Sequence, residues 1–274
     1  MWSRRSRVQV PSLTLRKPGV AITSKPSYLA VVPAYNEADT VVDVVRSIRD
    51  RAPEFDVVVI DDGSTDETRR QADAAGARVL HHPFNLGIGG AVQSGFMYAL
   101  EHGYDFMIQV DADGQHDPAE IEKLVDAMRR DPSLDMVCGS RFITKDHRYP
   151  APISRRTGIH LFAFIVSRIV DQRVSDPTSG FRLYNRRAIA LFARDYPHDY
   201  PEVEAVLMLH SHRLRMQEVP VRMYHRGGGV SSITSGKSLY YMVKVLLAIC
   251  VGLARRQPVV EPGDAAPVVA THGI

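Results

Sequence analysis

The sequence lacks several features that mark common classes of protein. Only two cysteines occur among 274 residues, Cys138 and Cys250, and both stand inside apolar runs rather than at metal-binding spacings. We expect both to be small buried hydrophobes in a reducing compartment. The net charge of +3 is weak and no basic run alternates with aromatic residues, so no nucleic-acid partner is expected.

Long apolar stretches are also missing. Residues 1–26 are basic but contain no sustained apolar segment, which excludes a secretory signal and predicts a disordered leader. The last apolar run, residues 239–254, contains Lys244 and is shorter than the ~20 residues that span a bilayer. We expect a folded domain at 27–235, a C-terminal amphipathic helix at 236–256 and a disordered tail at 257–274. The helix would lie on a membrane surface or dock on a small integral-membrane partner.

The usual nucleotide-binding fingerprints are absent as well. Gly87-Ile-Gly-Gly90 begins like a dinucleotide motif, but Val92 stands where the third glycine belongs. No GxxxxGK[ST] sequence occurs, which excludes a P-loop. Any nucleotide must therefore be held by other loops.

Short apolar runs alternate with polar loops and helical patterns through the first half of the chain. The helical spacing of Val41, Val44, Val45 and Ile48 follows the first run, and Ser64 with Glu67 has the spacing of a capping box for the next helix. Repeated strand–helix units predict a single α/β domain with a mostly parallel sheet flanked by helices. Ligands bind beyond the carboxyl ends of such strands, which gathers four loops at one edge: those at Pro33, Asp61, Asn85 and Asp111.

The acidic turn that follows the apolar run at residues 106–110 is the most informative of these loops. In an extended chain Asp111 and Asp113 lie on the same side, and Gln115 can join them. Two converging carboxylates repel one another unless a cation neutralises them, and Mg²⁺ or Mn²⁺ prefers such oxygen ligands together with phosphate. A calcium loop is excluded because His116 occupies its glycine position. Asp117, before Pro118, is expected to cap a helix.

Five motifs occur in order with sensible spacing: Val32-Pro-Ala-Tyr-Asn-Glu37, Asp61-Asp-Gly-Ser-Thr-Asp66, Asn85-Leu-Gly87, Asp111-Ala-Asp113 and Gly139-Ser-Arg-Phe142. With these motifs the chain resembles, over residues 27–235, the inverting family 2 glycosyltransferases of GT-A fold. The branch that it resembles contains the dolichyl- and polyprenyl-phosphate sugar synthases. The resemblance implies a UDP- or GDP-sugar donor, a Mg²⁺ or Mn²⁺ ion and a polyprenyl phosphate acceptor.

The same resemblance implies roles for individual residues on the donor side. It assigns Asp111, Asp113 and Gln115 to the metal, and Asp61 to the nucleotide base. The nucleotide-sugar set is Pro33, Tyr35, Glu37, Asp61, Asp62, Asn85, Gly87 and Asp111. Ile88 departs from the pattern because relatives often have a lysine in this turn, so a phosphate contact there would come from backbone N–H groups. Turn and cap chemistry is the alternative for Asp61, Asp62 and Asp66.

On the acceptor side the resemblance implies cationic donors. The acceptor-phosphate set is Arg141, Arg155, Arg156, Arg226 and Ser231, and the catalytic set is Asp113, Arg141 and Arg226. Bidentate arginine suits phosphate, although each arginine could instead be a solvated surface charge. Glycines 227–229 predict a mobile lid, and the apolar stretch 158–170 predicts a helix that is either buried or interfacial. The turn at 176–184 is expected near the transferred sugar.

Glu202 and Glu204 leave the acceptor chemistry open. In many family 2 enzymes an acid near this point deprotonates a sugar hydroxyl, whereas a phosphate acceptor is already ionised and needs no base. The two glutamates would then only cap a helix. We therefore expect an inverting, metal-dependent transfer to polyprenyl phosphate by an enzyme bound peripherally to the inner face of the plasma membrane. The rivals are transfer to a hydroxyl of a cell-surface polysaccharide or lipid-linked glycan, and a silent subunit that recruits a membrane partner.

Overall fold

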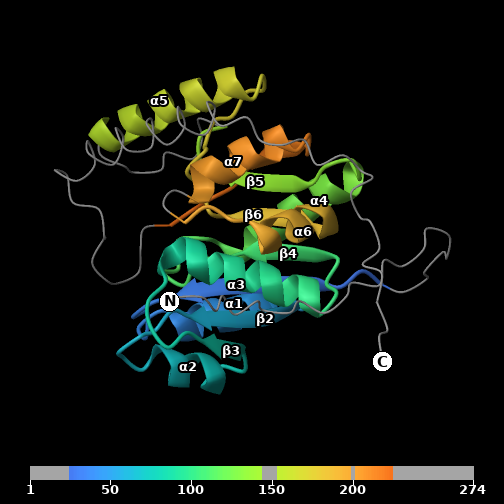
Figure 1. The fold of residues 1–274 in the computed structure, drawn as a ribbon. Coiled ribbons are helices and arrows are strands. Elements are labelled where there is room, and N and C mark those ends of the chain that lie inside the picture. Colours follow the sequence, from blue (N-terminus) through green and yellow to red (C-terminus); the bar gives the residue numbers. More distant parts are fainter. Residues whose placement is uncertain (1–24, 144–152, 199–200, 225–274) are drawn as a thin grey trace, which may run out of the picture.

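The computed structural model describes residues 25–143, 153–198 and 201–224, and they form one seven-stranded sheet with helices on both faces (Figure 1). This confirms the predicted α/β class with a mostly parallel sheet. The strands are β1 (Tyr28–Ala34), β2 (Phe55–Asp61), β3 (Arg78–His81), β4 (Phe106–Gln109), β5 (Met136–Ser140), β6 (Arg182–Asn185) and β7 (Met216–Pro220). The helices are α1 (Val41–Arg51), α2 (Thr68–Ala74), α3 (Gly87–Glu101), α4 (Ile121–Arg130), α5 (Ile153–Ile169), α6 (Arg186–Arg194) and α7 (Pro201–Ser211), with a 3₁₀ turn, η1, at Pro118–Glu120.

The core lies on both faces of the sheet because the central strands are apolar at almost every position. In β1, Leu29 and Val31 contribute to one core with α3 and α6, while Tyr28 and Ala30 contribute to the other with α1 and α4. Successive side chains of a strand point to opposite faces, so a continuous apolar run supplies both cores. Cys138 of β5 is fully buried, and burial raises the pKa of its thiol to about 12.

The strand order is β3-β2-β1-β4-β6-β5-β7. The first four strands are parallel, with Ala34 opposite Asp61 and Asp61 opposite His81, so their carboxyl ends lie at one edge. β6 enters antiparallel between β4 and β5, and places Arg182 opposite both Gln109 and Cys138. The sequence placed a turn and a short strand at residues 176–184 but did not predict the neighbours of that strand in the sheet. The inserted strand brings the turn that precedes it to the end of β4.

Of the two helix starts predicted from the sequence, one is confirmed and one is wrong. Asp117 caps η1, because its carboxylate accepts from the backbone N–H of Ala119, as expected. The capping box expected of Ser64 and Glu67 is wrong. The Ser64 hydroxyl accepts instead from the N–H of Asn36, in the loop after β1. The first turn of α2 is held by Asp66, which accepts from the backbone N–H of Thr68.

Helix α5 lies at the β5 end of the molecule, opposite the end that carries α2 (Figure 1). Of its described side chains, Phe162 and Val166 are buried, whereas Leu161 and Phe164 are exposed. The predicted helix thus has one packed face and one apolar exposed face. In the described part of the chain, no helix is both long and apolar enough to cross a membrane.

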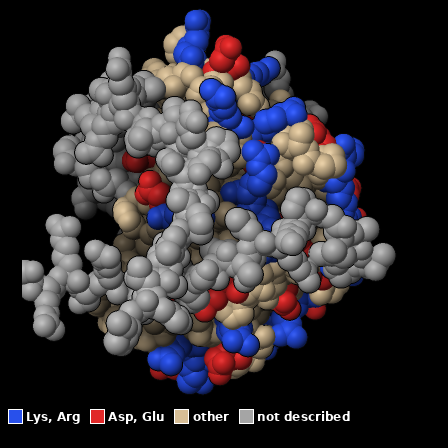
Figure 2. Space-filling model, turned by 45° about the vertical axis from the view of Figure 1, so that its right-hand side comes forward, with Lys and Arg blue, Asp and Glu red and all other residues tan. Residues whose placement is uncertain are grey.

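Basic side chains gather on the upper part of the face seen in Figure 2, with acidic side chains between them. Exposed arginines of the described residues pair with carboxylates, as Arg187 does with Asp135 and Arg215 with Asp131. Only the second pair is exposed on both sides and contributes little to stability, because Asp135 is buried. Such pairing partly neutralises this surface, and the polar loops at the carboxyl edge of the sheet are the stronger candidate for the functional site.

Candidate active site

The loops that follow β1 and β2 are tied to each other at this edge. The side-chain oxygen of Asn36, whose φ is +55°, accepts from the N–H of Thr65 at 2.8 Å. The N–H of the buried Glu37 donates to the Thr68 hydroxyl at 2.8 Å. Burial would raise the pKa of Asp66, but hydrogen bonds from Thr68 outweigh it and lower that pKa. The two loops therefore form one preorganised rim.

Asp61 lies inside this rim with 0% of its surface exposed. Its carboxylate is 2.8 Å from Nδ1 of His81 and accepts from the N–H of Ser64 at 3.1 Å. Pro33 is buried on the neighbouring strand, while Tyr35 is 46% exposed beside it. The structure thus brings Asp61, which was predicted to face the base, together with Pro33 and Tyr35 of the predicted nucleotide-binding loop, and their roles stay predictions.

Asp62 has a different environment from Asp61. Its two carboxylate oxygens accept from the backbone N–H groups of Leu86 and Gly87, each at 2.9 Å, at the start of α3. Nδ1 of His82 lies 2.7 Å from the same carboxylate, and Asn85 also accepts from the Gly87 N–H. Asp62 therefore caps α3 from another loop, which satisfies N–H groups that a helix start leaves without partners. Asp62 therefore has the helix-capping role that the sequence left open as the alternative to nucleotide binding.

The acidic turn follows β4 directly. Asp111 accepts from the side-chain amide of Gln109 at 2.9 Å, and its N–H donates to Nδ1 of His116 at 3.0 Å. Asp113 accepts from the N–H of Gln115 at 3.0 Å, which closes a tight turn. Gly114, with φ +75°, lies between them. All three predicted metal-binding residues therefore belong to one turn.

The donor set of this turn fits a divalent ion that is shared with a diphosphate. Nowhere in the described ranges do three or more His, Cys, Asp or Glu side chains form a metal-binding group. The turn instead offers two carboxylates and the amide of Gln115. Mg²⁺ is commonly bound by one or two carboxylates, with substrate phosphates and water completing its shell. Asp111 and Asp113 are partly exposed, so such a ligand can approach them.

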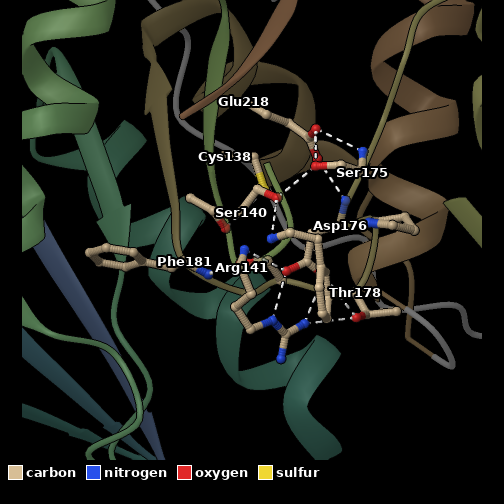
Figure 3. Close-up of polar contacts among 12 residues, drawn as sticks. Cys138, Ser140, Arg141, Ser175, Asp176, Thr178, Phe181 and Glu218 are labelled. Atoms are coloured by element: carbon tan, nitrogen blue, oxygen red, sulfur yellow. Dashed lines mark hydrogen bonds and ion pairs between the residues drawn. The ribbon is translucent and has the colours of Figure 1, made fainter. Parts of the chain in front are cut away.

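Arg141 follows β5 and is held by Asp176 (Figure 3). Its Nε and one terminal nitrogen donate to the two oxygens of Asp176, each at 2.7 Å, and the same terminal nitrogen donates to the Thr178 hydroxyl at 2.9 Å. Both members of the pair are buried. A bidentate pair fixes the plane of the guanidinium as well as its position. Arg141 is therefore an oriented cation and not a solvated surface charge.

Asp176 is fixed in turn by Glu218 of β7 (Figure 3). The carboxylate of Glu218 accepts from the N–H of Asp176 at 2.8 Å, and from the N–H and hydroxyl of Ser175, each at 2.7 Å. Burial raises the pKa of Glu218, although these hydrogen bonds oppose the shift. The Ser175 hydroxyl also contacts that of Ser140, at the end of β5. The turn that carries Asp176 is thus anchored to two strands.

This turn also touches the acidic turn. A Cβ placed on Gly180 would lie 2.8 Å from the amide nitrogen of Gln109 and 3.3 Å from an oxygen of Asp111. Glycine permits this close approach because it has no side chain. The turn at residues 176–180 therefore holds Arg141 at its start and comes close to Asp111 at its end, and its role near the transferred sugar stays a prediction.

Glu202 and Glu204 lie in the first turn of α7. Burial raises the pKa of Glu202. The positive charges of Arg182 and Arg141 oppose that shift, and Asp111 adds to it. The charges of the site residues thus act on Glu202, which its sequence position alone did not establish.

The remaining predicted acceptor residues are only partly described. Arg155 and Arg156 lie in the first turn of α5, but their side chains are not described. Arg226 and Ser231 lie outside the described residues, as do the glycines 227–229 and the helix expected at 236–256. The last described residue is Tyr224, whose N–H donates to the carbonyl of Gln115 at 2.8 Å. Its hydroxyl donates to Asp117 at 2.9 Å, so the chain leaves the described structure beside the acidic turn.

The sequence predicted the turn at 176–184 near the transferred sugar but assigned no individual role to three of its residues: Asp176, Gly180 and Arg182. The signal was present in Asp176-Pro-Thr-Ser-Gly-Phe-Arg182, where an acid and an arginine flank a turn inside an apolar context. Charged residues in such a context are rarely buried unless they are paired. Which partners they have depends on the placement of β6, and the chain order does not give that placement.

Comparisons with known proteins agree with this geometry. The family model described as "Glycosyl transferase family 2" matches residues 29–192, more than half of the chain. An undecaprenyl-phosphate mannosyltransferase of Micrococcus luteus is 32% identical over 76% of this chain and 88% of its own length. A polyprenol monophosphomannose synthase of Mycolicibacterium smegmatis is 30% identical over 79% of this chain and 84% of its own length.

A solved structure shares the fold. Glucosyl-3-phosphoglycerate synthase from Mycobacterium tuberculosis, in complex with Mn²⁺, uridine diphosphate and phosphoglyceric acid, has a TM-score of 0.63 and 20% identity. The match covers 83% of this chain and 78% of that one. The chain therefore belongs to glycosyl transferase family 2 and is a glycosyltransferase of the GT-A fold.

Proposed function

We propose that the protein moves a sugar from a nucleoside-diphosphate donor to polyprenyl phosphate, with inversion, at the cytoplasmic face of the membrane. The observation that carries the proposal is the turn at residues 176–180, which comes close to the acidic Asp111 at one end and holds the oriented Arg141 at the other. The anionic leaving group needs a metal ion, which Asp111 would help to hold, and the anionic acceptor needs a cation such as Arg141. The two sites must lie close together for the reaction. The two relatives are named for transfer to undecaprenyl phosphate and polyprenol phosphate.

On the donor side, Pro33, Tyr35 and Asp61 would hold the nucleotide. Asp111, Asp113 and Gln115 would hold Mg²⁺ or Mn²⁺ against the diphosphate, where the bound ion stabilises the charge of the leaving group. Crystals of the fold relative contain Mn²⁺ and uridine diphosphate, which supports a divalent ion in this chain.

On the acceptor side, a phosphomonoester is already largely ionised at neutral pH because its second pKa is about 6. It therefore needs cationic donors and no general base. Arg141 is oriented for this by Asp176. Arg226 follows Tyr224 by two residues, a reach of about 7 Å, and Tyr224 is bonded to Gln115 in the acidic turn. Arg155 and Arg156, at the start of α5, would extend the same cationic surface.

The step is an in-line displacement. An oxygen of the acceptor phosphate forms a bond to the anomeric carbon while the bond from that carbon to the donor diphosphate breaks, and the electron pair leaves with the nucleoside diphosphate. Attack opposite the leaving group inverts the anomeric configuration. Because the attacking oxygen carries no proton, positioning and charge neutralisation provide the catalysis.

The exposed face of α5 supports a membrane location. Phe164 is 58% exposed, and the Arg168 guanidinium lies 5.0 Å from the centre of its ring. Leu161, one turn earlier, is also exposed. Aromatic and aliphatic side chains with a cation beside them suit the boundary between lipid headgroups and acyl chains. The acceptor's lipid tail would lie in the same layer.

The test is a panel of UDP-, GDP- and dTDP-sugars, each incubated with the purified protein, Mg²⁺ or Mn²⁺ and a short polyprenyl phosphate. Mass spectrometry should find one glycosyl phosphate lipid, and none when the corresponding polyprenol without phosphate is offered. Equal transfer to the unphosphorylated alcohol would contradict the phosphate acceptor. No binding or turnover of any nucleotide sugar would contradict the whole proposal.

A hydroxyl acceptor, in a cell-surface polysaccharide or lipid-linked glycan, is the second candidate. The observation that favours it is the position of Glu202, which lies near Asp111 and Arg141 with a raised pKa. A raised pKa suits a general base at neutral pH. Under this alternative the variant Glu202→Gln loses transfer while donor binding survives. Under the main proposal transfer continues.

A further inference from the structure

Arg182 is the largest fully buried side chain among the described residues, with 1% of its surface exposed. It opens β6, the antiparallel strand between the strands that carry the two halves of the site. Its backbone lies opposite Gln109, two residues before Asp111, and opposite Cys138, three residues before Arg141. This backbone position alone does not give Arg182 a role in the reaction. Any role must follow from the contacts of its side chain.

The side chain of Arg182 turns back onto the loop that precedes its own strand. Its Nε donates to the carbonyl of Ser179 at 2.7 Å, and one terminal nitrogen donates to the carbonyl of Pro177 at 3.0 Å. The other terminal nitrogen and the Tyr184 hydroxyl are buried without a hydrogen-bond partner among the residues that the structure describes. The guanidinium is thus used to hold two backbone carbonyls.

Stability alone is a poor reason for a cation at this place. Moving a charge out of water costs several kcal/mol, and apolar residues of similar volume often serve equally well in a core. A lysine would carry the charge but would present one nitrogen, whereas the two carbonyls are reached from two nitrogens of one rigid plane. The geometry therefore depends on the guanidinium fork and not only on its charge.

The loop held in this way is the turn at residues 176–180. Asp176, at its start, holds the guanidinium of Arg141, and Gly180, at its end, is so close to the acidic turn that a Cβ there would lie 3.3 Å from an oxygen of Asp111. Movement of this turn by a fraction of an ångström would change the distance between the metal-binding turn and the acceptor cation. Misplacement of about 1 Å in an enzyme site can cost ~100-fold in rate.

We propose that Arg182 is a positioning residue that sets the spacing between Asp111 and Arg141 by holding the turn between them. This rests on the proposed transfer reaction, and it adds a residue that touches neither donor nor acceptor. Arg182 acts through the Asp176–Arg141 pair, so its loss should impair transfer more than nucleotide binding.

The experiment compares Arg182→Lys and Arg182→Met with wild type and with Arg130→Met, an exposed arginine at the end of α4. Turnover with polyprenyl phosphate, nucleotide affinity with Mn²⁺, and hydrogen exchange of residues 176–181 are measured for each. We expect Arg182→Met to lower kcat by about 100-fold, with the nucleotide Kd little changed and exchange faster only near this turn. Arg182→Lys should fall between, and Arg130→Met should match wild type.

A double variant separates positioning from general stability. If Arg182 acts through Asp176, then Asp176→Asn combined with Arg182→Lys is no slower than Asp176→Asn alone. Additive losses, a wild-type rate in Arg182→Met, or equal losses of nucleotide binding and transfer in Arg182→Lys would each overturn the proposal. Should wild type transfer no sugar to polyprenyl phosphate, the proposed function fails instead. In that case, hydrogen exchange of Arg182→Lys still tests whether Arg182 holds the turn. Unchanged protection at residues 176–181 would refute the positioning role.

Discussion

Replacing Asp62 by asparagine provides the sharpest separation of a structural from a substrate-binding role. Asp62 stands in a motif that the family resemblance assigns to the nucleotide, yet its carboxylate accepts from the backbone N–H groups of Leu86 and Gly87 and lies against His82. Asp62→Asn keeps the shape and one acceptor oxygen. Its amide nitrogen would replace the oxygen that faces Gly87, so a donor would meet a donor.

The expected cost follows from these contacts. Asp62 is 3% exposed, and the variant loses one hydrogen bond to an ionised acceptor together with the negative charge at the start of α3. A hydrogen bond to a charged group contributes about 1.5–3 kcal/mol, and a charge at a helix terminus about 0.3–1 kcal/mol. Asp62→Asn should therefore lower the free energy of unfolding by about 2–4 kcal/mol. For a chain of this size the Tm should fall by roughly 5–15 °C.

Urea and thermal unfolding followed by circular dichroism measure this change. The matched control is Asp73→Asn, an exposed aspartate of α2, which should unfold like wild type. Nucleotide affinity is measured below the Tm of each variant. A variant as stable as wild type that has lost nucleotide affinity would refute the capping role and assign Asp62 to the nucleotide.

Three further predictions concern the site itself. Asp111→Asn should weaken Mn²⁺-dependent nucleotide binding, measured by calorimetry, by about tenfold or more, and retained metal-dependent affinity would contradict the metal assignment. Gly180→Ala should lower turnover and cost about 1–3 kcal/mol by overpacking, since its Cβ would press on Gln109; turnover equal to wild type would contradict this contact. Burial raises the pKa of Glu202 in the folded state, so its proton is held more tightly there than in the unfolded chain. Wild type should therefore lose stability relative to Glu202→Gln as the pH rises from the ordinary glutamate pKa toward neutral, and parallel unfolding curves would contradict that shift.

Local sequence patterns predicted the parallel half of the sheet well. The apolar runs at β1, β2 and β4 are continuous, each is followed by a polar loop, and the spacing of the intervening apolar residues is helical. Because the carboxyl ends of parallel strands lie at one edge of a sheet, Asp61 and Asp111 could be assigned to the same edge without knowledge of any contact. These predictions succeeded because strand, loop and helix lie next to each other along the chain.

Contacts between distant segments could not be predicted in the same way. The capping box failed because Ser64 bonds across to Asn36, 28 residues away, and Asp66 took over the helix start. Arg141 was expected to contact the acceptor, but its pairing with Asp176, 35 residues later, depends on the strand β6 that follows Asp176 and enters the sheet beside β5. The placement of β6 follows from packing of the whole sheet.

The inserted strand explains how one sheet can serve two anionic reactants. The parallel strands β2, β1 and β4 end in acidic and turn-forming side chains, which suit a metal-bound diphosphate but would repel a second phosphate. β5, beyond β6, is followed by Arg141, and the antiparallel β6 separates that cation from the carboxylates by one strand. Asp176, at the start of the turn before β6, orients the guanidinium of Arg141, and the neutral Gly180, at its end, stands close to Asp111. This turn therefore holds the cation and the acidic turn near each other as separate binding groups for the two reactants.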